Sequence, residues 1–106
     1  MGDKERTIRN YLDKKGLQKD LSGYYFLESA ISYTISNPTM KCHGIFRKMI
    51  AEGKLDCSLD SAYSASAYVL KQAKADTTVK RFVRLAADNI VREMSINGKE
   101  GNHTCH

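Results

Sequence analysis

The stretch Gly16–Ile31 reads GLQKDLSGYYFLESAI, and it decides the fold that the sequence predicts. Gly16 follows a segment with helical apolar spacing, at a place where a left-handed residue commonly ends a helix. Ser22 can accept a hydrogen bond from the exposed amides of a following turn, so it predicts the start of a second helix. Leu27 and Ile31 then share one face of that helix. The stretch therefore predicts two helices joined by a short connection.

Helical spacing continues along nearly the whole chain, and no alternating run flanked by hairpin turns interrupts it. The predicted helices run from about Lys4 to Lys15, from Ser22 to Asn37–Pro38, around Ile45–Ile50 up to Gly53, from about Leu59 to Lys74 with Ser58 or Asp60 as cap, and from Asp76 or Thr77 to Asn97–Gly98. We expect an all-α fold, a compact bundle of about five helices. It forms a single domain over residues 1–97, followed by a flexible tail over residues 98–106.

Composition favours a polyanionic partner. The 106 residues include 17 Lys and Arg against 12 Asp and Glu, which gives a net charge of +5. Three cysteines are an odd number at wide spacing, and no secretory leader opens the chain, so we expect free thiols in a reducing cytoplasm. No run of apolar residues approaches the length of about 20 that a membrane helix needs, and no membrane association is expected.

Two segments resemble a known DNA-binding family. Gly23, Tyr24, Phe26, Leu27, Ala30 and Ile31 stand at the spacing of its Gly-Tyr-x-Tyr-Leu-x-x-Ala-Ile motif, and Phe82–Asp88 is similar to its closing Phe-Ile-Ala-Met-Val-Ala-Asp segment. The family is the C-terminal effector domain of the sporulation initiation master regulator, stage-zero sporulation protein A. The resemblance covers roughly two thirds of the chain. It implies a helix-turn-helix core, with the predicted helix Leu59–Lys74 as the recognition helix, in a stand-alone transcription regulator without a phosphoacceptor domain.

The predicted recognition helix departs from the family pattern. Between Asp60 and Lys71, serines and alanines stand where family members carry arginines, so no DNA-contacting residue can be transferred from the family one by one. The candidate contacts to double-stranded DNA are therefore chosen by their place on or near the predicted helix-turn-helix. Hydroxyl and cationic side chains there can contact phosphates and base edges. These candidates are Arg47, Lys48, Ser61, Tyr63, Ser64, Lys71, Lys74, Lys80 and Arg81.

A second apolar stripe on the predicted recognition helix leaves an alternative open. Tyr63, Ala67 and Leu70 lie on a different side from the stripe that includes Val69. They either pack inside the domain or form a surface for a protein partner or a homodimer. In the second case the chain would be a repurposed helical domain from a phage or mobile element, acting as a protein-binding inhibitor or adaptor without DNA readout.

Enzymatic and metal chemistry find little support in the sequence. No nucleophile elbow, phosphate-binding glycine loop or His-Glu-x-x-His motif is present, so we expect no enzyme and no cofactor. The spacing of Cys42-His43 and of His103-Thr104-Cys105-His106 matches no recognised zinc pattern, and no metal site is predicted. On the last predicted helix, Arg84, Asp88 and Arg92 have the i, i+4 spacing of an ordinary surface ion-pair face.

Overall fold

Five helices follow one another in the computed structural model, which describes residues 3–102 and the side chains of residues 3–94. They are α1 (Asp3–Lys14), α2 (Ser22–Ser36), α3 (Cys42–Ala51), α4 (Leu59–Gln72) and α5 (Val79–Asn102). Residues 3–102 contain no strand, so the predicted all-α fold is confirmed. Within this part of the chain, no helix combines the length and apolarity that crossing a lipid bilayer would require.

The turns between the helices follow the predicted chemistry in part. Gly16 and Gly53 have φ angles of 84° and 80°, in the left-handed region that glycine adopts without strain. The Ser58 hydroxyl caps α4 by accepting a hydrogen bond from the Ser61 amide. The predicted cap at Ser22 is wrong, because Ser22 is the first residue of α2 and the cap position before it carries no side-chain hydrogen bond.

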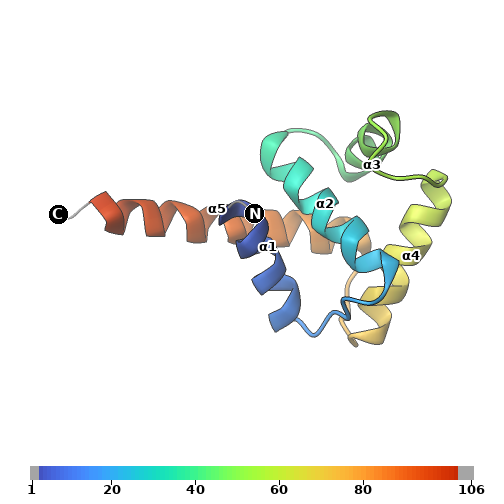
Figure 1. Cartoon of the computed structure of the whole chain (residues 1–106), viewed down its shortest axis with the longest axis horizontal. Coiled ribbons are helices and arrows are strands. Elements are labelled where there is room, and N and C mark those ends of the chain that lie inside the picture. The colour runs from blue at the N-terminus through green and yellow to red at the C-terminus, as the bar shows by residue number, and fades with distance from the viewer. Residues whose placement is uncertain (1–2, 103–106) are drawn as a thin grey trace.

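The last helix differs from its prediction at both ends. Its first turn is capped by Thr78, whose hydroxyl accepts a hydrogen bond from the Arg81 amide, and not by Asp76 or Thr77. It continues to Asn102, past the predicted end at Asn97–Gly98. A glycine inside a helix costs only about 1 kcal/mol relative to alanine and does not break the helix as proline does. Figure 1 shows the final turns of α5 projecting beyond the other helices. Of the tail predicted over 98–106, residues 103–106 lie outside the described residues.

Helix α2 lies at the centre of the bundle and contacts each of the other four helices (Figure 1). Its apolar side chains Leu27, Ala30 and Ile31 are fully buried. The same helix also buries Glu28, whose carboxylate accepts a hydrogen bond of 2.7 Å from Nε of Arg9 on α1. A buried charge needs such a partner, because burial removes its hydration. Helix α2 therefore organises the core, and α1 is fixed to it by one ion pair and by apolar contact.

Gly23 allows α2 and α4 to approach closely. A Cβ atom at this position would lie 2.5 Å from Cγ2 of Val69 and 2.7 Å from the carbonyl carbon of Ala65, both on α4. Real side chains do not approach this closely, so only glycine fits. The fully buried small side chains of Ala62 and Ser66 belong to the buried face of α4. The position of α4 thus depends on the absence of a side chain at one residue of α2.

Lys74 lies in the turn after α4 and has an unusual conformation. Its φ angle is 59°, although an L-residue with a side chain pays about 1 kcal/mol for the left-handed region. We expect Lys74→Gly to raise the free energy of unfolding by about 0.5–1 kcal/mol, because glycine is free of that strain. Urea denaturation measures the change. Lys74→Ala is the control and should bring no gain; an equal gain from alanine would show that backbone strain is not the cause.

Candidate functional site

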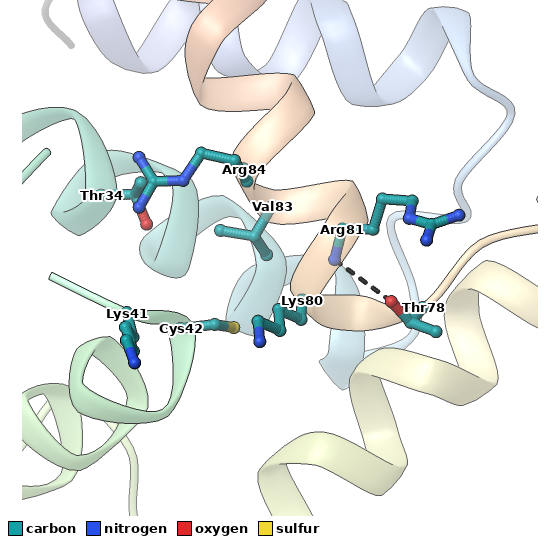
Figure 2. A pocket seen from close by; sticks show the side chains of 8 residues that line it. All are labelled: Thr34, Lys41, Cys42, Thr78, Lys80, Arg81, Val83 and Arg84. Atoms are coloured by element: carbon teal, nitrogen blue, oxygen red, sulfur yellow. Dashed lines mark hydrogen bonds between the residues drawn. The ribbon is translucent and has the colours of Figure 1, made fainter. Parts of the chain in front are cut away.

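A basic cavity of about 440 Å³ lies between the start of α3 and the start of α5. Figure 2 shows the Cys42 side chain of α3 facing Lys80 of α5, with Lys41 next to Cys42 in the chain and Arg84 further along α5. Its lining residues are Thr34, Lys41, Cys42, Thr78, Lys80, Arg81, Val83 and Arg84. Four of them are cationic and none is acidic. The cavity therefore has an uncompensated positive charge and favours an anion.

Arg84 has a structural role that the sequence did not suggest. Its two terminal guanidinium nitrogens each donate a hydrogen bond of 3.0 Å, one to the carbonyl of Pro38 and the other to the carbonyl of Met40. These bonds fix the connection between α2 and α3 against α5. The predicted ion-pair face of Arg84, Asp88 and Arg92 is wrong, because none of the ion pairs found among the described residues includes any of the three.

The thiol of Cys42 lies in this cavity but is poorly suited to chemistry. Burial raises its pKa, although Tyr63, Lys80 and Arg84 each act in the opposite direction. The thiolate is the reactive form of cysteine, and a raised pKa makes it scarcer at neutral pH. Lys80 and Arg84 line the same cavity as this thiol. Cys42 is therefore part of the cavity wall, and the cations determine what the cavity attracts.

The outer face of α4 is polar. Ser61, Ser64, Tyr68 and Lys71 are all exposed and lie on one side of the helix, opposite the buried face that centres on Ser66. Tyr68 is 52% exposed and was not among the predicted site residues. Tyr68 is four residues after Ser64 and three before Lys71, and this spacing could have placed it on the same helix face from the sequence. Asp60 is exposed near the beginning of α4 and brings a negative charge to the same side of the helix.

Leu70 belongs to the interior, and Tyr63 is half-buried against α3. Leu70 is 2% exposed and forms part of the core. The Tyr63 ring packs on Phe46 of α3 with 4.6 Å between ring centroids. Burial and the adjacent Cys42 thiol raise the pKa of the Tyr63 phenol. Of the two alternatives left open for Tyr63, Ala67 and Leu70, the burial favours packing inside the domain for Leu70 and in part for Tyr63, whereas Ala67 is exposed. The same packing counts against Tyr63 as a DNA contact.

The basic residues of α3 are in different situations. Nζ of Lys48 lies 2.9 Å from a carboxylate oxygen of Glu52, and the Tyr33 hydroxyl donates a hydrogen bond of 2.6 Å to the other oxygen. The hydrogen bonds from Tyr33 and Lys48 lower the pKa of Glu52. The ion pair with Glu52 also means that Lys48 already has a partner within the protein. Arg47 is exposed and lines a separate depression of about 370 Å³ with His43, Ile50 and Leu59. Arg47 is thus available to an external anion, and Lys48 is engaged.

The structure divides the predicted DNA contacts into separate groups. Ser61, Ser64 and Lys71 share the outer face of α4, and Lys74 is exposed in the turn that follows it. Lys80 and Arg81 line the basic cavity between α3 and α5 instead. Sequence reasoning missed Lys41 as a member of that cavity, because Lys41 is far from Lys80 in the chain. Among the described residues, no group of three or more His, Cys, Asp or Glu side chains is arranged to hold a metal ion, and His103, Cys105 and His106 lie outside them.

Comparison of the chain with known proteins finds no relative. No protein-family model matches the chain, and no curated protein or solved structure matches it at a significant level. The functional argument therefore depends on the residues themselves.

Proposed function

We propose that this chain is a small cytoplasmic DNA-binding protein of the helix-turn-helix class that acts in transcription. In this proposal α3 and α4 form the helix-turn-helix and α4 is the recognition helix, as the resemblance to the sporulation regulator's effector domain implies. The observation that carries it is the polar outer face of α4 together with the cations around it. Serine, tyrosine and lysine side chains on an exposed helix face are suited to contact base edges and phosphates.

Cations free of protein partners support phosphate contact. Arg47, Lys54, Lys71 and Lys74 are exposed, and no ion pair found within the described residues includes any of them. They flank α4 on the α3 side and at its C-terminal end. Asp60 opposes contact at the leading end of α4, so the backbone contacts are expected mainly from these flanks. Removing that charge with Asp60→Asn should strengthen binding.

The protein-binding alternative loses the surface on which it depended. Leu70 lies in the core, and Tyr63 is packed on Phe46. A partner cannot reach Leu70 without opening the domain, and Tyr63 is half-buried against α3. We therefore do not adopt the inhibitor or adaptor role through that stripe.

Binding to DNA can be tested by fluorescence anisotropy with random duplex DNA. With about four phosphate contacts, the affinity should fall about a hundred-fold between about 50 mM and about 200 mM salt, because binding releases condensed counterions. Lys71→Glu with Lys74→Glu should weaken binding strongly and reduce the salt slope by about two. Both changes are on exposed residues, so the fold should remain intact.

A matched double variant controls for net charge. Arg6→Glu with Arg92→Glu makes the same charge change on exposed residues of α1 and α5, and it should leave most of the affinity. Equal losses in the two double variants would show that only net charge matters and would remove α4 from the interface. No binding at low salt would contradict the proposed function.

A further inference from the structure

The basic cavity between α3 and α5 has a size and charge that suit a small ligand better than a duplex. Its volume of about 440 Å³ is within the usual range for small-molecule sites. A DNA duplex meets a protein surface over a wide area and can reach only the rim of such a cavity. The half-buried Arg84 therefore calls for a smaller ligand than the one proposed for α4.

One cation of the cavity, Arg84, is held in place before any ligand arrives. The two hydrogen bonds from Arg84 to the carbonyls of Pro38 and Met40 fix its guanidinium group. A guanidinium has five N–H donors, so part of its capacity remains for an anion. Lys80 points across the cavity towards Cys42, whereas the Arg81 guanidinium is directed away from Lys80 (Figure 2). Lys41, Lys80 and Arg84 are thus the three cations that an anion inside the cavity would meet.

Neutral donors complement these charges. The Thr78 hydroxyl accepts a hydrogen bond from the Arg81 amide, which leaves its own proton free to be donated. Helix α3 begins beside Lys41 without a side-chain cap, so its first amides have no side-chain acceptor. Amides at the start of a helix favour an anionic oxygen. The cavity wall also includes the apolar Val83 and the Cys42 thiol.

We propose that this cavity binds a small molecule carrying two or more phosphate groups. Three cations around one open cavity match several negative oxygens, whereas a single carboxylate would leave most of that charge uncompensated. No carboxylate lines the cavity to repel such a ligand. The proposal does not depend on DNA binding by α4, and it uses a different set of side chains.

Isothermal titration calorimetry with inorganic pyrophosphate tests this proposal on the full chain. We expect one molecule to bind per chain, and Lys41→Gln with Lys80→Gln to weaken binding by about ten-fold or more, since both are charge-assisted contacts. Both lysines are exposed at the cavity rim, so their replacement should preserve the fold. Lys71→Gln with Lys74→Gln is the matched control and should bind pyrophosphate as the unchanged protein does. Arg84 is left unchanged because it also secures the connection between α2 and α3.

The outcomes separate the possible sources of phosphate. Sodium sulfate at matched ionic strength should bind much more weakly; equal binding would overturn the proposal for phosphate groups. Absence of heat with millimolar pyrophosphate, or equal affinity in the Lys41→Gln, Lys80→Gln variant, would overturn it as well. If pyrophosphate fails to bind while that variant loses affinity for duplex DNA, the cavity is a DNA-backbone contact: the small-ligand proposal falls and DNA binding stands. If pyrophosphate binds and DNA does not, the proposed function falls alone.

Discussion

Gly23→Ala should lower the free energy of unfolding by about 3 kcal/mol, although alanine is the better helix former by about 1 kcal/mol. The new methyl group would lie within 2.7 Å of the Ala65 carbonyl carbon and 2.5 Å from a methyl group of Val69. Backbone atoms of α4 cannot rotate away as a side chain can. The helices α2 and α4 must therefore separate, which loosens a contact in the middle of the core. A thermal melt followed by circular dichroism should show a decrease in Tm of more than about 10 °C.

Gly44→Ala is the matched control for this change. Gly44 also lies inside a helix, α3, and a Cβ atom there would meet Cγ of Met40 at 3.0 Å. Met40 is a flexible, half-buried side chain that can shift by a few tenths of an ångström. The gain in helix propensity should then leave Tm unchanged or raise it by a few degrees. If Gly23→Ala behaves in the same way, α2 and α4 do not pack as closely as described.

Gly23 also illustrates which features of the fold can be predicted from the sequence and which depend on tertiary contacts. The helices and most of their connections could be predicted, because apolar spacing, the proline after Asn37 and the glycines at positions 16 and 53 are local signals. Gly23 could be noted as part of a motif, but the backbone atoms that exclude a side chain there belong to α4. Local patterns do not contain that information, and the tertiary contact supplies it.

The candidate site was less predictable for the same reason. Ser61, Ser64 and Lys71 were predicted as DNA contacts from their place on the predicted recognition helix, and all three are exposed, whereas Tyr63 of the same set is packed on Phe46. The basic cavity combines Lys41 with Lys80 and Arg84, which only the packing of α3 against α5 brings together. Spacing along one helix also suggested that Arg84 pairs with Asp88, whereas the guanidinium binds carbonyls of a distant connection. A side chain with several donors takes the partners that the fold provides.

Tyr63 and Leu70 give the second large prediction. Leu70→Ala should cost about 2–5 kcal/mol, because Leu70 is 2% exposed and its loss leaves a cavity. Tyr63→Ala should cost about 2 kcal/mol more, because it removes the aromatic contact with Phe46 and uncovers Cys42. A domain of this size has a total stability of about 5–15 kcal/mol, so the double variant should be only marginally folded. Urea denaturation of the two single variants and the double variant measures these losses.

Substitutions of an exposed tyrosine and an exposed leucine test whether the stability lost in these variants comes from burial. Tyr68 on α4 is 52% exposed and Leu85 on α5 is 53% exposed, so Tyr68→Ala and Leu85→Ala should each change the free energy of unfolding by less than about 0.5 kcal/mol. The difference between the members of each pair isolates packing from helix propensity, because each pair replaces the same side chain inside a helix. If the double variant at Tyr63 and Leu70 has the same stability as the unchanged protein, these two side chains lie on the surface and not in the interior. That result would also reopen the protein-partner alternative, since two large side chains without a structural role would then need an external one.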